Sequence, residues 1–155
     1  MLDLKPFYNE GLSFSCTRCS ACCRHESGFV FLSETDVSSL AAEFKLPVER
    51  FIKAYCRWVP SKENTERLSL REKSNFDCIF WDSGCKVYNS RPLQCKTFPF
   101  WPNVLNLEES WTWTGENCPG INKGKLHNMK EIEKILVSQA LKPIITRKSL
   151  IMRGS

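Results

Sequence analysis

Apolar positions recur at spacings of three and four in three parts of the chain, which is the periodicity of a helix that buries one face. The first part begins at Ser33, where Asp36 completes a capping-box pattern three residues on, and its apolar stripe ends at Phe44. A second helix is expected over about 47–56 and a third over 128–141. The pattern therefore predicts about three helices.

Short apolar runs between polar turns predict strands. Residues 28–32 form one such run, and Leu68 and Leu70 alternate with polar neighbours as a half-buried strand does. Residues 76–120, with their proline- and aromatic-rich centre, are expected to have little regular structure of their own. The fold class that follows is a small α+β domain over residues 1–142, with short strands and with cysteine-rich loops tied down by metal. A basic tail over 143–155 follows, whose packing the sequence leaves open.

Charge and length narrow the function. The chain has 155 residues, enough for one domain, and a net charge of +5. Four of its basic residues fall in the last fifteen positions, so the rest of the chain is nearly neutral, and nucleic acid is an improbable partner. No apolar run approaches the roughly 18 residues that span a bilayer, which predicts no membrane partner. The first residues lack the features of a signal peptide, so we expect a cytoplasmic protein.

Cysteine usage points to metal. The chain has nine cysteines and only two histidines, and structural disulfides are rare in the cytosol. The densest stretch reads Cys16-Thr-Arg-Cys19-Ser-Ala-Cys22-Cys23. Two-residue spacing lets successive thiolates converge on one centre, and backbone amides can also donate to the sulfurs. Cys22 and Cys23 are adjacent and their side chains tend to diverge, so one of the pair can serve a second centre.

Eight of the nine cysteines are predicted metal ligands. A disulfide framework and a set of buried thiols are the alternatives, and the dense spacing and the missing signal peptide disfavour both. Cys56 has no cysteine neighbour and is expected to be a buried free thiol. Four thiolates complete either a zinc site or one iron–sulfur cluster. We assign one centre to Cys16, Cys19, Cys22 and Cys118, and the other to Cys23, Cys78, Cys85 and Cys95. An exchange of Cys22 and Cys23, or a single centre that uses fewer ligands, stays open.

The order of these motifs carries a resemblance. The run C-x2-C-x2-C-C is followed by Asp77-Cys78, by Gly84-Cys85, by Arg91-Pro-Leu-Gln-Cys95 and by Cys118-Pro-Gly120. This order resembles the CxxCxxCC cysteine-cluster family, described as zinc- or iron-chelating proteins, over roughly residues 7–136. The resemblance implies a thiolate metal site in a small cytoplasmic protein, with no settled reaction.

Two arguments bear on the identity of the metal. The C-x2-C-x2-C run with the remote Cys118-Pro119 resembles the ligand order of bacterial-type ferredoxins, whereas closed four-thiolate sites in small domains are often structural Zn²⁺. We favour an iron–sulfur cluster for one centre and leave the metal of the other open. Two roles are open. In the first, the metal is structural or transfers electrons for a protein partner that the sequence does not identify. In the second, the protein is a metal-dependent enzyme that modifies a protein or peptide. No catalytic residue can be named.

Other side chains have competing interpretations. His25 could bind metal, donate to a sulfur, or be an ordinary surface histidine, and His127 is expected at the surface. Arg91 could bond backbone carbonyls or offset thiolate charge. Aromatic residues crowd the second cysteine group, where they either exclude water from a cluster or fill the core: Phe80, Trp81, Phe98, Phe100, Trp101, Trp111 and Trp113.

Overall fold

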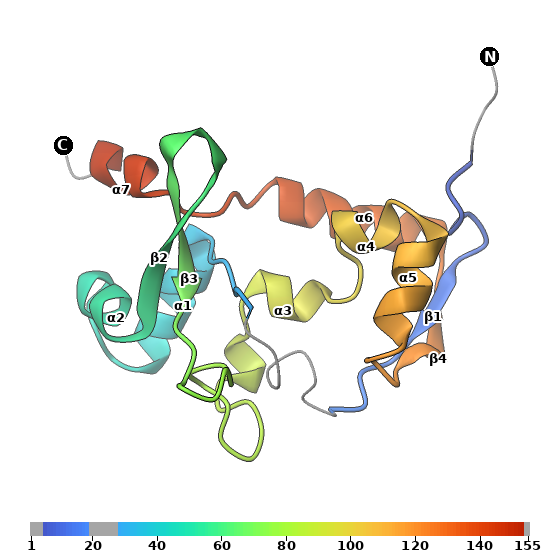
Figure 1. Ribbon diagram of the computed structural model, residues 1–155, viewed down its shortest axis with the longest axis horizontal. Helices are drawn as coiled ribbons and strands as arrows, with labels where there is room; N and C mark the ends of the chain where they lie inside the picture. The colour runs from blue at the N-terminus through green and yellow to red at the C-terminus, as the bar shows by residue number, and fades with distance from the viewer. Residues whose placement is uncertain (1–4, 19–27, 154–155) are drawn as a thin grey trace. The chain divides into compact units, whose positions relative to one another are not determined.

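The chain divides into two compact units, each built from two separate stretches of sequence. The computed structural model describes residues 5–18 and 28–153. The first unit comprises residues 1–21 and 97–141, and the second comprises 22–96 and 142–155. Each unit combines helices with one two-stranded antiparallel sheet, so the predicted α+β class is confirmed. The described residues form more helices than the three expected (Figure 1).

Two helices of the second unit confirm the periodic pattern. Helix α1 (Glu34–Glu43) begins after Ser33, whose side chain accepts from the Asp36 amide at 3.3 Å while the Asp36 carboxylate accepts from the Ser33 amide at 2.8 Å. This is the predicted capping box. Helix α2 (Val48–Tyr55) follows Pro47, as expected from the fixed φ of proline at a helix start.

The sheet of the second unit pairs β2 (Cys56–Pro60) with β3 (Glu66–Leu70) around the 3-10 turn Lys62–Asn64. Residues 28–32, predicted as a strand, form isolated backbone hydrogen bonds with β3 but no continuous strand. The Leu32 amide donates to the Leu68 carbonyl at 3.1 Å, and the Leu70 amide donates to the Val30 carbonyl at 2.9 Å. This apolar segment therefore lies along β3 as an irregular third member of the sheet.

The basic tail packs within the second unit. The Ile145 amide donates to the Leu32 carbonyl at 2.9 Å, and the Ile145 carbonyl accepts from the Leu68 amide at the same distance. Helix α7 (Arg147–Arg153) follows, and its first residue forms an ion pair with Glu66 at 3.2 Å and covers the Trp58 ring. The tail is thus tied to β2 and β3 by backbone and side-chain contacts.

Aromatic stacking fills the core of the second unit. Phe44 stacks on Phe80 with ring centroids 5.3 Å apart and on Tyr55 at 5.0 Å. Around these rings lie the buried residues Leu32, Val37, Leu40, Ala41, Phe51, Cys56, Leu68, Leu70, Val87 and Ile145. The core therefore joins the helices α1 and α2 to the sheet and to the tail.

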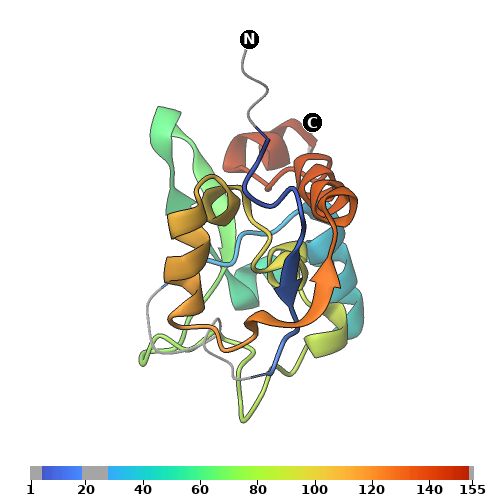
Figure 2. The same ribbon diagram turned by 90° about the vertical axis from the view of Figure 1, so that its right-hand side faces the viewer.

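In the first unit, β1 (Leu12–Phe14) pairs with β4 (Ile121–His127), and Figure 2 shows the two strands side by side. Helix α6 (Met129–Ala140) follows β4 and is capped by the Asn128 side chain, which accepts from the Glu131 amide at 2.9 Å. This helix confirms the third predicted one. The core of the unit consists of Phe100, Val104, Leu105, Trp111, Ile121 and Ile132.

The expectation that residues 76–120 have little regular structure is wrong. They contain the short helices α3 (Leu93–Thr97), α4 (Pro102–Leu105) and α5 (Glu108–Gly115), as well as the 3-10 turn Tyr88–Ser90. Proline precedes or opens two of these helices, and proline is compatible with a first helical turn. In α5, the glutamates of the first turn lie where the helix dipole favours negative charge.

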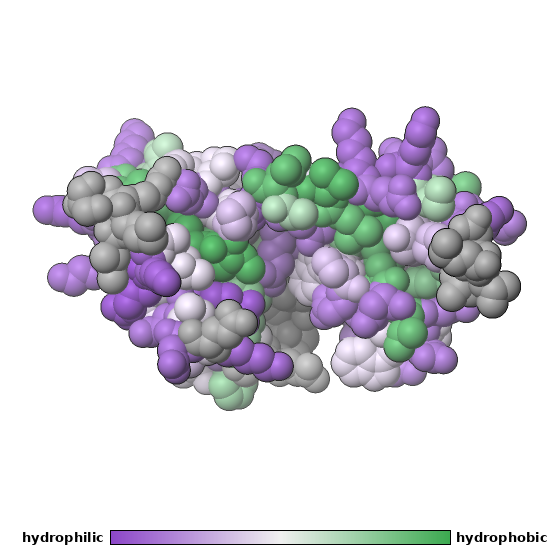
Figure 3. Space-filling view, turned by 90° about the horizontal axis from the view of Figure 1, so that it is seen from above, coloured by the Kyte–Doolittle hydropathy of each residue, from purple (hydrophilic) through white to green (hydrophobic). Residues whose placement is uncertain are grey.

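No helix of the described residues is long and apolar enough to cross a membrane. Seen from above, apolar patches lie among hydrophilic side chains on the surface (Figure 3). Val137 and Leu141 are the exposed large apolar residues at the end of α6, 54% and 75% accessible.

Candidate metal centre

Five of the eight predicted ligands fall within the described residues. Cys16 is exposed, and Cys78, Cys85, Cys95 and Cys118 are partly exposed. The remaining three, Cys19, Cys22 and Cys23, lie outside the described residues, as does His25. Within 5–18 and 28–153, no three cysteine, histidine or carboxylate side chains are grouped as a metal site requires. The described cysteines are therefore best characterised by the backbone that carries each of them.

Cys16 and Cys118 lie on neighbouring backbone segments in the first unit, just after β1 and just before β4. The amide of Ser15, just before Cys16, donates to the carbonyl of Gly120 at 3.3 Å. A Cβ atom at Gly120 would lie only 2.2 Å from the Ser15 carbonyl oxygen, so glycine is needed for this close approach. Cys118 packs against the core of the same unit. The fold thus brings the start of the cysteine run and the Cys-Pro motif to the same end of the β1–β4 sheet.

The Cys16 sulfur already accepts a backbone hydrogen bond. The Arg18 amide, two residues on, lies 3.4 Å from Cys16 Sγ. This is the amide-to-sulfur bond that the two-residue spacing predicts.

Cys78 and Cys85 lie on one looped segment of the second unit. The Trp81 amide donates to the Cys78 carbonyl at 2.9 Å, and Trp81 forms a bridge with Cys85. The Lys86 amide donates to the Phe80 carbonyl at 2.9 Å. Both cysteines pack against the core through this loop, where Phe80 is only 4% exposed. Turn bonds and a bridge thus hold the backbones of both cysteines within this loop.

Cys95 lies on α3, which is held by the side chains of Asp36 and Gln94; the sequence indicated only the capping role of Asp36. The Asp36 carboxylate, besides capping α1, accepts from the Leu93 amide at 2.9 Å. The Gln94 amide group donates to the Phe29 carbonyl at 2.7 Å and accepts from the Phe31 amide at 3.0 Å. Gln94 therefore ties the helix of Cys95 to the segment that follows the cysteine run.

The first residue of that segment is anchored as well. The Gly28 carbonyl accepts from the Arg57 guanidinium at 2.8 Å, and its amide donates to the Glu72 carboxylate at 3.3 Å. Arg57 and Glu72 are themselves 3.5 Å apart as an ion pair. The backbone of residues 28–31 is thus fixed by three side chains from other parts of the second unit.

Cys56 has a different environment from the predicted ligands. It is 3% exposed, in the core at the start of β2. Burial raises the pKa of its thiol from 9.0 to about 12, although the nearby Arg71 charge acts in the opposite direction. The thiol therefore stays protonated at neutral pH, and thiolate is the form that binds metal. The sequence expectation of a buried free thiol agrees with this position.

Two further predictions can be compared with the structure. Arg91 donates to the Tyr88 carbonyl at 2.9 Å and lies over the Tyr88 ring, which confirms its role as a partner of backbone carbonyls. The prediction that His127 is a surface residue is wrong. Its side chain is 18% exposed, and its Nε2 lies 3.0 Å from the Phe14 carbonyl, across the β1–β4 pair.

The aromatic residues have no common role. Phe80, Phe100 and Trp111 are buried and fill the two cores, which agrees with the interpretation of these three as core residues. Trp111 also donates to Asn122 at 2.9 Å. Trp113, by contrast, is 66% exposed on the same helix.

The donor chemistry fits a thiolate-bound metal. Thiolates are the soft ligands that select zinc and iron–sulfur clusters, and every described candidate has at least partial access to solvent. The buried Cys56 lacks that access and is not part of the set. The eight cysteines would supply all the ligands of such a centre, with backbone amides as partners of the sulfurs.

Comparisons with known proteins are consistent with this chemistry. The family described as "CxxCxxCC: Putative zinc- or iron-chelating domain" matches residues 15–119, a range that contains all eight predicted ligands. An uncharacterized protein of Methanocaldococcus jannaschii is 28% identical over 123 residues. The matched part is 76% of this chain and 63% of the relative, so the chain spans less than two thirds of that protein's length. No solved structure matches the chain.

Proposed function

The chain belongs to the CxxCxxCC family of zinc- or iron-chelating domains, and on this premise we propose that its eight cluster cysteines hold metal as thiolates in two centres. One centre takes Cys16, Cys19, Cys22 and Cys118, and the other takes Cys23, Cys78, Cys85 and Cys95. The observation that carries the proposal is the bond between Ser15 and Gly120, because it supports a shared centre for the first and last cysteines of the motif.

The second centre is supported by the backbone anchors of the second unit. Gln94 bonds the segment at 29–31, and Cys95 is its neighbour in sequence. Cys78 and Cys85 lie on a loop that packs against the core of the same unit. These contacts limit the movement of the helix that contains Cys95 and of the loop that contains Cys78 and Cys85. Since ordered carriers reduce the entropy lost on binding, they favour metal capture.

For the first centre we favour an iron–sulfur cluster over Zn²⁺, and the metal of the second centre stays open. The C-x2-C-x2-C run with a remote Cys-Pro follows the ligand order of bacterial-type ferredoxins, and the Ser15–Gly120 contact supports the use of Cys118 together with that run. A cluster would supply one-electron redox chemistry, and zinc would supply structural cross-linking alone. The role that we propose is structural or electron-transferring, in the cytoplasm and for a protein partner.

Anaerobic purification followed by metal analysis and an optical spectrum tests this proposal. Iron, acid-labile sulfide and broad visible absorption are the expected results, and a colourless protein with stoichiometric zinc would contradict the choice of iron. Cys118→Ser and Cys95→Ser should each remove metal from one centre and leave the other loaded. Cys56→Ala is the matched control, because this residue is buried and lies outside the set. Loss of both centres in each single variant would contradict the two-centre assignment.

A further inference from the structure

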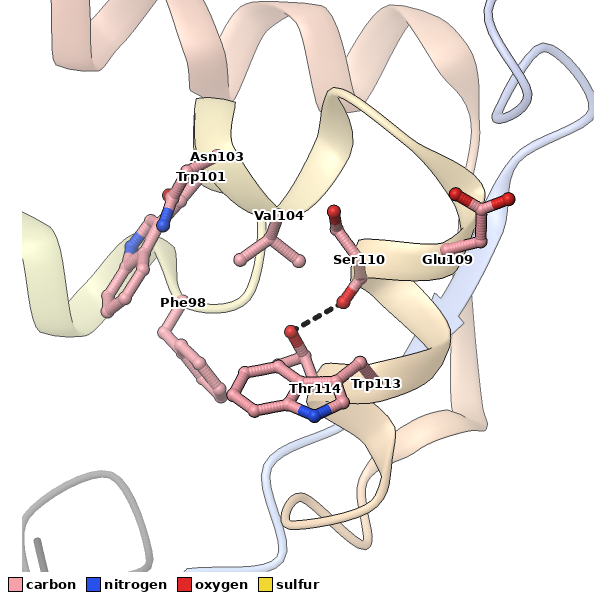
Figure 4. A pocket seen from close by; sticks show the side chains of 8 residues that line it. All are labelled: Phe98, Trp101, Asn103, Val104, Glu109, Ser110, Trp113 and Thr114. Carbon is pink, nitrogen blue, oxygen red and sulfur yellow. Dashed lines mark hydrogen bonds between the residues drawn. The ribbon is translucent and has the colours of Figure 1, made fainter.

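The first unit contains an open groove between α4 and α5. Its volume is about 510 Å³, within the range of small ligand sites. Phe98, Trp101 and Trp113 line it together with Val104, Ser110 and Glu109. Figure 4 shows Trp101 on one side of Val104, with Phe98 between it and Trp113. Among the described residues, no cysteine lines this groove, so it is separate from the five described candidate ligands.

The aromatic rings of the groove are arranged for contact with a ligand. Phe98 and Trp101 meet edge to face with centroids 5.0 Å apart, which fixes these two rings against each other. Trp113 is 66% exposed, whereas Trp111 of the same helix is 3% exposed and supplies the core. An exposed indole that continues into two further rings forms the kind of apolar patch that marks an interaction site.

The stretch of sequence that forms the groove carries charge of one sign. Residues 97–122 contain three glutamates, Glu108, Glu109 and Glu116, and no lysine or arginine, although the whole chain has a net charge of +5. All three glutamates are exposed, and Glu109 is part of the groove lining. The field of this stretch attracts cations and repels phosphates.

We propose that this groove binds a lysine or arginine side chain from a basic segment of a protein partner. The apolar stem of such a side chain packs on Phe98 and Val104, as long basic side chains do on apolar surfaces. Its charged head lies against the Trp113 face, since indole is the best cation–π partner among the aromatic side chains, and Glu109 supplies the opposite charge. The inference goes beyond the proposed function, because the groove requires no metal.

The test uses a short acetylated and amidated peptide that carries arginine among glycine and alanine. Its neutral twin carries citrulline, which keeps the shape of arginine without the charge. Binding to the purified holoprotein is followed through the indole N–H resonances of ¹⁵N-labelled protein. The arginine peptide should shift the Trp113 and Trp101 signals, more strongly at low salt, and the citrulline peptide should bind more weakly.

Variants locate the site. Trp113→Ala should weaken binding about two- to fivefold, the range of an exposed cation–π contact, and Glu109→Gln should weaken it and reduce its dependence on salt. Leu126→Ala is the control, since Leu126 is an exposed apolar residue on β4 and does not line the groove. Equal affinity for the citrulline peptide, unchanged affinity in Trp113→Ala, or no binding of either peptide would overturn the proposal. None of these outcomes depends on the metal content, so failure here is distinguishable from failure of the proposed function.

Discussion

The amide of Ser15 donates to the carbonyl of Gly120 across 3.3 Å. This bond connects the residue before the first cluster cysteine to the residue that ends the Cys118-Pro119-Gly120 motif. The contact is reinforced by the Ser15 hydroxyl, which accepts from the Lys125 amide at 2.9 Å. Two segments of the proposed first centre that are far apart in the sequence, those of Cys16 and Cys118, are thereby joined through their backbones.

Gly120→Ala tests this attachment. The new methyl group would lie 2.2 Å from the Ser15 carbonyl oxygen, so the two backbones must separate, at a cost of about 1–3 kcal/mol in unfolding free energy. We expect weaker metal binding at the first centre and normal binding at the second. Metal stoichiometry and competition with a chelator measure both effects. Gly28→Ala is the matched control, because a methyl group there meets nothing within 4 Å. Equal metal retention in the two variants would contradict the prediction.

Gln94→Ala removes the two bonds to Phe29 and Phe31. Because these bonds position the helix of Cys95, we expect about tenfold weaker metal binding at the second centre, the scale seen for residues that orient ligands. Gln94→Glu keeps the acceptor and should lose less. Gln139→Ala serves as control, since Gln139 also bonds a backbone carbonyl, that of Phe100, at 2.8 Å, but in the first unit. Chelator titrations of the three variants decide the matter, and an unaffected second centre in Gln94→Ala would sink the idea.

The burial of Cys56 leads us to expect that the free energy of unfolding depends on pH. Its pKa of about 12 in the folded protein is above the 9.0 expected when it is exposed, so the unfolded chain loses this proton first. Stability is therefore intact below pH 9 and declines between pH 9 and 12, by about 1.4 kcal/mol per pH unit. Relative to wild type, Cys56→Ala lacks this decline. Urea unfolding of both proteins at pH 8 and pH 10 should show their difference shrink by about 1 kcal/mol, and a constant difference would be contrary to the assigned burial.

We expect metal removal to reduce protection from hydrogen exchange more in the second unit than in the first. The loop that carries Cys78 and Cys85 is held by short turn bonds, such as that from the Lys73 amide to the Asp77 carbonyl at 2.7 Å. Helix α5, in contrast, contributes Trp111 to an apolar core. Because binding energy is also folding energy, hydrogen exchange after chelation should accelerate over 72–87 and stay slow in α5. Uniform acceleration, or none, would argue against metal as the support of the loop.

The sequence predicted those features that short-range signals encode. The Ser33–Asp36 capping box and the stripes of α1, α2 and α6 are visible within a few residues. Helices α4 and α5 were missed because Pro102 looks like a breaker but opens a helix. Strand β4 was missed because residues 122–126 are exposed, so that no alternation marks them. The bonds of Gln94 and the contact of Ser15 with Gly120 join distant segments, and no local pattern reveals them.

The site was predicted by residue type more than by position. The isolated position of Cys56 indicated a buried thiol, and the structure places it in the core. The assignment of the other eight cysteines as ligands stays a prediction. His127 was misplaced because its polar neighbours suggest a surface, whereas the pairing of β1 with β4 covers its ring. The groove beside Trp113 was not foreseen, since exposed and buried tryptophans look alike in sequence.

The two bonds of Gln94 also bear on aggregation. Residues 28–32 read Gly-Phe-Val-Phe-Leu, an apolar run of the kind that adds strands from other molecules when its edge is open. One edge of this run faces β3, and the other presents the Phe29 carbonyl and the Phe31 amide, which Gln94 occupies. A single side-chain amide thus takes the place of a neighbouring strand and blocks the edge against intermolecular pairing. The residue that positions a proposed ligand therefore also occupies the backbone groups through which another chain could pair with this segment.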